Sequence, residues 1–205
     1  MNAERAVEEL KLIRQLMERP VRYSTMSGLS GILAGAAALA GVACDWQISA
    51  GYADNPHRAF WLNLVVWAGV FVTAFLAATV LTRLRELRQG MPFWSPAKRK
   101  VLGTILPPFV AGAGLTVAVA GRWYLGAGSG EWGLIPAIWM CFYGLACWQV
   151  GTFSIVEIRV LGAAFVLAGI LSAAFGQGHP YWALGLTFGA FHMIYGVVVW
   201  IRHGG

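Results

Sequence analysis

The sequence predicts an all-α membrane protein built from six transmembrane helices. Of its 205 residues, 58% are hydrophobic and only 12% are charged, whereas a soluble domain is about 25% charged. So little charge cannot cover the surface of a soluble core. The apolar residues also gather in six long windows, and Lys and Arg lie in the short stretches between them, which is the pattern of membrane proteins.

The six windows have the length that a membrane span requires. A helix rises about 1.5 Å per residue, so a hydrocarbon core of about 30 Å needs about 20 apolar residues. Together the windows form a transmembrane domain over residues 23–205, which follows an N-terminal segment over residues 1–22. The predicted spans are residues 24–43, 59–82, 101–121, 132–153, 158–177 and 181–201.

The N-terminal segment is predicted to form an amphipathic helix over residues 3–19. Apolar residues recur there at spacings of three and four, and Arg5 with Glu9 and Arg14 with Glu18 form i,i+4 pairs of opposite charge. Two interpretations are equally compatible with this pattern. The helix lies on the cytoplasmic face of the membrane, or it binds a cytoplasmic partner.

The distribution of basic residues predicts the orientation. If both termini lie in the cytoplasm, all 15 Lys and Arg residues except Arg58 and Arg122 fall on the cytoplasmic side. Cytoplasmic loops of membrane proteins carry such an excess. The formal charge of +6 is therefore attributed to topology, and no nucleic-acid partner is expected.

Short motifs recur between the second and third pairs of predicted spans, which indicates three tandem helical hairpins. The alternative is coincidence between short matches in apolar sequence. The matching motifs are Lys100-Val101-Leu102-Gly103 with Arg159-Val160-Leu161-Gly162, and Tyr143-Gly144 followed by Trp148 with Tyr195-Gly196 followed by Trp200.

Helix ends and interruptions are also predicted. Asn55 and Ser95 each precede a proline and are expected to be N-caps. Pro107 and Pro108 in the third span, and Pro136 in the fourth, each lack a backbone N–H. We expect them to kink or break their helices.

His192 is the most informative candidate site residue, because it falls at the centre of the sixth span. Ionisable residues are rare at this depth and usually face protein or water. Gly185, Gly189 and Gly196 share its helical face at spacings of three and four, so His192 is expected to point into the bundle near Tyr195. Its role is a proton relay, a ligand anchor or a haem ligand, or else a purely structural hydrogen bond.

Other polar residues add little chemistry. Tyr143 and Asn63 join His192 and Tyr195 as candidate ligand-binding residues, although polar residues in spans more often serve interhelical hydrogen bonding. A haem site would need a second histidine within a span, and the sequence offers none. Neither a cofactor nor a metal is therefore expected, and without a nucleophile–base pair or paired carboxylates we expect no enzyme. Asp45, Asp54, His57 and Arg58 are assigned to a solvated first outer loop.

Two stretches near the ends of the chain are distinctive. They are residues 9–35 (ELKLIRQLMERPVRYSTMSGLSGILAG) and residues 152–202 (TFSIVEIRVLG … GAFHMIYGVVVWIR). These stretches resemble a group of small multi-pass bacterial membrane proteins that have no established activity. The resemblance implies a bacterial inner membrane and supplies no catalytic residue.

Two functional hypotheses follow for a non-enzymatic inner-membrane protein. In the first, the bundle binds or transports a small solute, or senses one, at His192. In the second, the protein is a structural accessory subunit of a larger membrane complex. Besides the lipid bilayer, the expected partner is a cytoplasmic or membrane protein bound through residues 3–19 and the basic loop 83–100, and homo-oligomers are compatible with the sequence.

Overall fold

The computed structural model describes residues 27–88, 90, 92–126, 131–175 and 180–203. Every regular element within these ranges is helical, which confirms the all-α class. The predicted amphipathic helix over residues 3–19 lies outside the described residues, as does the rest of the N-terminal segment 1–22, so it stays a prediction.

Five helical segments are long and apolar enough to cross a membrane, which supports a helical membrane protein. They are α2, α3, α4, α6 and the segment Trp182–His203. The fourth predicted span, residues 132–153, instead comprises a short 3-10 helix and the 16-residue helix α5, which is apolar but shorter. The elements are α2 (Gly28–Gly51), α3 (Pro56–Arg88), α4 (Pro96–Tyr124), η1 (Glu131–Leu134), α5 (Ile135–Val150), α6 (Val156–Phe175), α7 (Pro180–Leu184), the π-helix η2 (Gly185–Phe191) and α8 (His192–His203).

One stretch assigned to a loop from the sequence is helical. Helix α2 continues past the predicted end at residue 43 to Gly51, so the assignment of Asp45 to an outer loop is wrong. A charged residue there ends an apolar window without ending the helix, since helical hydrogen bonds do not depend on hydropathy. Most of the basic stretch 83–100 is also helical, because α3 reaches Arg88 and α4 begins at Pro96, directly after the expected N-cap Ser95.

The expected N-caps are confirmed. The Asn55 side chain accepts a hydrogen bond of 3.0 Å from the backbone N–H of Arg58. The Ser95 side chain accepts one of 3.2 Å from the backbone N–H of Lys98. Each satisfies a backbone donor in the first turn of its helix that has no intrahelical partner.

The prolines in α4 and α5 do not break their helices. Helix α4 continues through Pro107 and Pro108 without a break. Pro136 does not interrupt a span, because it lies in the first turn of α5, directly after η1. A missing backbone N–H costs nothing in a first turn, so this proline marks a helix start.

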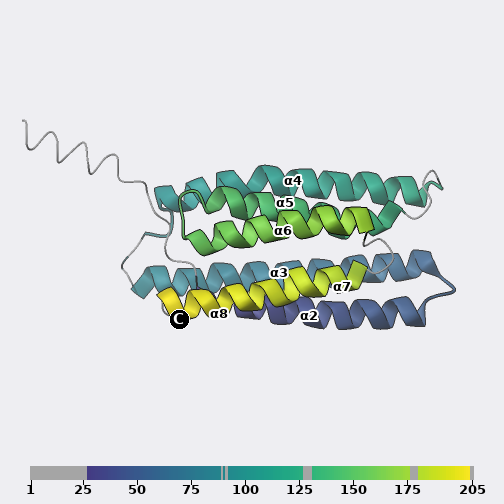
Figure 1. The fold of residues 1–205 in the computed structure, drawn as a ribbon, viewed down its shortest axis with the longest axis horizontal. Coiled ribbons are helices and arrows are strands. Elements are labelled where there is room, and N and C mark those ends of the chain that lie inside the picture. The colour runs from purple at the N-terminus through teal and green to yellow at the C-terminus, as the bar shows by residue number, and fades with distance from the viewer. Residues whose placement is uncertain (1–26, 89, 91, 127–130, 176–179, 204–205) are drawn as a thin grey trace, which may run out of the picture.

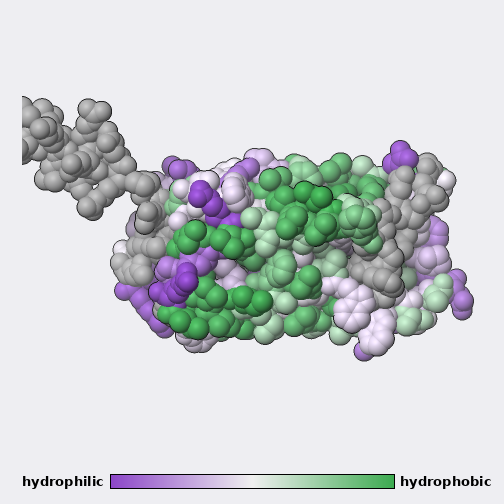
Figure 2. Space-filling view, viewed as in Figure 1, coloured by the Kyte–Doolittle hydropathy of each residue, from purple (hydrophilic) through white to green (hydrophobic). Residues whose placement is uncertain are grey.

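The helices lie side by side in two layers (Figure 1). One layer contains α4, α5 and α6, and the other contains α3, α2 and α8, with neighbours in each layer closely packed. In the view of Figure 2, hydrophobic residues cover the middle of the molecule and hydrophilic residues gather towards both ends. This distribution fits a protein surrounded by lipid along its length.

Each layer contains one pair of helices in backbone contact through glycine. In the α5–α6 glycine contact, a Cβ added to Gly144 would lie 2.8 Å from the Gly162 carbonyl oxygen. In the α2–α8 glycine contact, a Cβ added to Gly28 would lie 2.5 Å from the Gly196 carbonyl oxygen. Side chains larger than hydrogen would therefore force either pair of helices apart.

The two glycine contacts explain only part of the sequence repeat. The Tyr-Gly-x-x-x-Trp motif occupies equivalent places, because Gly144 packs on α6 and Gly196 packs on α2. The other motif is not equivalent. Gly162 packs against the backbone of Trp148, whereas a Cβ at Gly103 would meet no described atom within 4 Å. Three matching tandem hairpins are therefore not confirmed.

Candidate functional site

The candidate site lies where the two layers meet, around the start of α8. His192 is the first residue of α8 and directly follows the π-helix η2. π-helical turns are rare and occur frequently at functional sites. Gly185 and Gly189 lie within η2, where they weaken the preference for regular α-helix. These glycines were the available sequence signal for η2, which sequence reasoning missed.

Buried His192 and half-buried Tyr143 form a pair across the layers. The Tyr143 hydroxyl and the His192 Nε2 atom are joined by a hydrogen bond of 2.6 Å, and His192 is 7% exposed. Aromatic rings surround the pair, with the centroids of Phe165 and Phe188 at 5.3 and 6.0 Å from that of His192. The sequence placed both residues among the candidates, and the structure brings them together.

The second ring nitrogen of His192, Nδ1, is buried, and no hydrogen bond of regular geometry reaches it from the described residues. The backbone groups of Thr187 and Phe188 in η2 nevertheless interact with the ring. A buried polar atom without a partner of good geometry is unusual in a folded protein.

Tyr195 lies close to this region without joining the hydrogen bond. It packs against the apolar cluster that contains Phe165 and also against the cluster that contains Cys147 and Ile158. Tyr143 packs against the same two clusters. Tyr195 is therefore a neighbour of the pair, placed where α8 faces the other layer.

Asn63 belongs to a different polar group, on α2 and α3. Its side-chain N–H donates to the Ser49 hydroxyl over 3.2 Å, and Trp67 donates to Asp45 over 3.1 Å. The Ser49 hydroxyl in turn donates to the Asp45 carboxylate over 3.5 Å. Asp45, which is only 8% exposed, is the centre of this group and was missed because it was assigned to a solvated loop. Its spacing of four from Ser49 was the available signal.

Rings connect this polar group to His192. The Trp67 ring lies 6.5 Å from the Phe188 ring, and the Phe188 ring stacks on His192. No hydrogen bond between Asn63 and His192 occurs in the described part of the chain. The structure therefore separates Asn63 from the His192–Tyr143 pair that it was expected to join.

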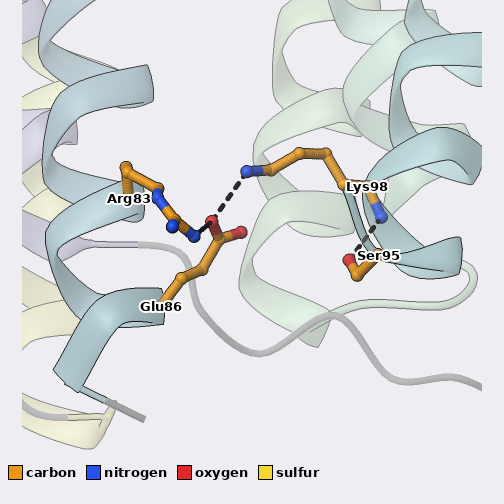
Figure 3. A network of polar contacts seen from close by, with 4 residues as sticks. All are labelled: Arg83, Glu86, Ser95 and Lys98. Carbon is orange, nitrogen blue, oxygen red and sulfur yellow. Dashed lines mark hydrogen bonds and ion pairs between the residues drawn. The ribbon is translucent and has the colours of Figure 1, made fainter. Parts of the chain in front are cut away.

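A third polar group joins the layers at the C-terminal end of α3 (Figure 3). The Glu86 carboxylate lies 2.7 Å from the Lys98 ammonium of α4 and 3.5 Å from the Arg83 guanidinium. Glu86 is 1% exposed, and its Oε1 atom lacks a hydrogen-bond partner among the described residues. Sequence reasoning registered only the basic residues of this stretch, although a lone acid among them was visible.

Aromatic contacts also join α3 and α4. The rings of Phe71 and Phe109 lie 5.8 Å apart, and Trp123 packs on His57 at 4.3 Å and on Phe60 at 4.9 Å. Like the Glu86–Lys98 and Tyr143–His192 contacts, these contacts between the layers are made by side chains. The glycine contacts lie within the layers.

No protein-family model, no curated protein and no solved structure matches this chain. The resemblance of residues 9–35 and 152–202 to small bacterial membrane proteins gains no support from these comparisons.

Proposed function

We propose that the protein binds a small polar solute beside His192 in the course of transport or sensing, and that it is not an enzyme. The observation that carries this proposal is the hydrogen bond across the two layers between buried His192 and half-buried Tyr143. Intramembrane ionisable residues with such partners commonly mark solute or proton pathways.

The arrangement of the layers supplies a way to open this site. Backbone contacts through glycine hold α5 to α6 and α2 to α8, so each layer tends to move as a unit. Side-chain contacts at the boundary can separate and form again. A shear or hinge movement between the layers would exchange the Tyr143 hydroxyl for a solute group at His192.

The topology that we propose is six spans in a bacterial inner membrane with both termini in the cytoplasm. η1 and α5 together have a length of about 30 Å, which supports the fourth predicted span, residues 132–153. Arg85 of α3 donates to the backbone of His203 over 3.0 Å, and Arg202 of α8 pairs with Glu157 of α6. Basic ends of several helices thus share one end of the bundle, as the positive-inside rule requires for the cytoplasmic side.

A thermal-shift screen of small polar solutes tests the proposal. Purified protein in detergent is heated with each solute, and a solute that binds raises the melting temperature by mass action. We expect solutes that stabilise the natural protein to lose this effect in His192→Ala and to bind with altered affinity in Tyr143→Phe. Tyr124→Phe is the matched control, because Tyr124 is exposed at the end of α4.

The result that would overturn the proposal is a solute whose stabilising effect is the same in His192→Ala as in the natural protein. Size-exclusion elution of each variant establishes that it is folded. A screen in which no polar solute stabilises the natural protein also counts against a solute site at His192.

The second candidate is an accessory subunit of a larger membrane complex. It is favoured by α3, whose most apolar stretch has no buried residue although the helix has 33 residues. Such a helix provides a long face for a neighbouring protein. Purification in a mild detergent distinguishes the two functions, because an accessory subunit co-purifies with stoichiometric partners whereas a solute-binding protein elutes alone or as a homo-oligomer.

A further inference from the structure

The two glycine contacts each form an apolar groove on the outside of the molecule. The groove beside the α2–α8 contact has a volume of about 250 Å³ and is lined by Ile32, Val197, Trp200 and Ile201. The groove beside the α5–α6 contact has a volume of about 390 Å³ and is lined by Leu145, Trp148, Ala163, Val166, Leu167 and Ile170. Trp148 and Trp200 occupy equivalent positions in the repeated motif, so the two grooves have a similar structure.

A cation distinguishes the α5–α6 groove from the other. The Arg159 guanidinium lies over the Trp148 ring at 5.4 Å from its centroid, and Trp148 lines the groove. Arg159 and Ala163 are four residues apart on α6, with Val166 and Ile170 continuing the same face at spacings of three and four. The Arg159 guanidinium therefore lies at one end of the apolar α5–α6 groove.

This cation has unused hydrogen-bonding capacity. In the described part of the chain no carboxylate pairs with Arg159, whereas Lys98 and Arg202 have Glu86 and Glu157 as partners. The Nε atom of Arg159 is buried without a hydrogen-bond partner, so a ligand reaches the guanidinium through its terminal nitrogens. These N–H groups can bind a phosphate group through two parallel hydrogen bonds.

We propose that the α5–α6 groove binds an anionic phospholipid of the surrounding bilayer. One acyl chain lies along Leu145, Val166 and Ile170, and the phosphate group contacts Arg159 beside the Trp148 ring. The combination of an apolar groove with a cation at its end matches a molecule that has a hydrocarbon chain and an anionic head, and a lipid reaches an outward-facing groove directly from the membrane. The α2–α8 groove, which lacks an equivalent cation on Trp200 among the described residues, binds chains without preference for the head group.

Native mass spectrometry of the full chain in detergent tests this proposal. The protein is mixed with dioleoyl phosphatidylglycerol or dioleoyl phosphatidylcholine, which have the same chains and differ in head-group charge. We expect the natural protein to retain phosphatidylglycerol preferentially. Arg159→Gln should reduce this preference about fivefold, since one basic residue near the membrane surface contributes about 1 kcal/mol to binding of anionic lipid.

Matched variants separate the parts of the site. Arg159→Lys keeps the charge but loses the two parallel hydrogen bonds, so it should keep only part of the preference. Arg99→Gln should leave the preference unchanged, because Arg99 is exposed and lies over Trp94 rather than over a groove residue. Ala163→Phe should fill the groove and reduce retention of phosphatidylglycerol. Val197→Phe fills the α2–α8 groove instead and should leave the head-group preference intact.

Three results would overturn the proposal. The first is equal retention of the two lipids by the natural protein, and the second is an undiminished preference in folded Arg159→Gln or Ala163→Phe. The third is a co-purified polypeptide that excludes lipid from the natural protein and is released by Ala163→Phe, since the groove would then be a protein interface. If Arg159→Gln does not fold, Ala163→Phe still decides between these outcomes.

Discussion

The contacts within the layers and the contacts between them are built from different parts of the polypeptide. Within the layers, Gly144 meets Gly162 and Gly28 meets Gly196 at distances that exclude any side chain. Between the layers, Tyr143 meets His192 and Glu86 meets Lys98 through the ends of side chains. Backbone contacts fix the separation of two helices, whereas side-chain contacts can break and form again without moving the helix backbones far. Each layer is therefore held rigidly, whereas the contacts between the layers can adjust.

The largest effect is expected for Gly162→Val, which breaks a contact within a layer. The new side chain would overlap the backbone of Trp148 and the carbonyl oxygen of Gly144, so α5 and α6 must separate. We expect a loss of about 3 kcal/mol in the free energy of unfolding. Denaturation of the purified protein in mixed micelles measures this change.

The matched control for Gly162→Val is Gly103→Val. It makes the same substitution at the corresponding position of the repeat, where an added Cβ meets no described atom within 4 Å. A comparable loss of stability in the two variants would show that the helix propensity of valine, rather than the glycine contact, determines the result.

A smaller effect is expected for Lys98→Met, which breaks the ionic contact between the layers. Glu86 would remain buried, with Arg83 at 3.5 Å as its remaining cation. Removing one partner of a buried pair is strongly destabilising, and because Arg83 compensates in part we expect a loss of about 2 kcal/mol. Adding Glu86→Gln should restore part of the loss, since the uncompensated charge is removed. If the double variant is no more stable than Lys98→Met, the buried charge is not the cause.

The smallest effect on stability is expected for Tyr143→Phe. It removes one interhelical hydrogen bond and keeps the ring that packs on Phe165 and Phe188. Such bonds contribute about 1 kcal/mol. A Tyr143→Phe variant as destabilised as Gly162→Val would mean that the boundary is as rigid as the layers, which contradicts the proposed movement.

Much of the architecture was predictable because it depends on local composition. Long apolar windows predicted the long helices, and the residues before Pro56 and Pro96 predicted two N-caps that the structure confirms. Helix ends were less predictable. The boundary at residue 43 was wrong because Asp45 remains in α2, where it accepts a hydrogen bond from Trp67, and a partner on another helix cannot be inferred from a local window.

The candidate site was predictable only in part. Glycine spacing placed His192 towards the bundle, and its burial is consistent with this. The choice of Tyr143 as its partner, rather than Tyr195 or Asn63, depends on how α5 and α8 are rotated towards each other. The π-helix directly before His192 was not predicted either.

Residue type and spacing along one helix were enough to predict a helical and apolar chain. Glycine positions also predicted which helices can approach closely, since glycine permits backbone contact wherever it occurs. Which glycines are used depends on how the helices pack. Gly162 is packed and Gly103 is open although their local sequences match, because the contact depends on a second helix that arrives from elsewhere in the chain. The same reason applies to Glu86, whose burial requires α4, and to Arg159, whose groove requires α5.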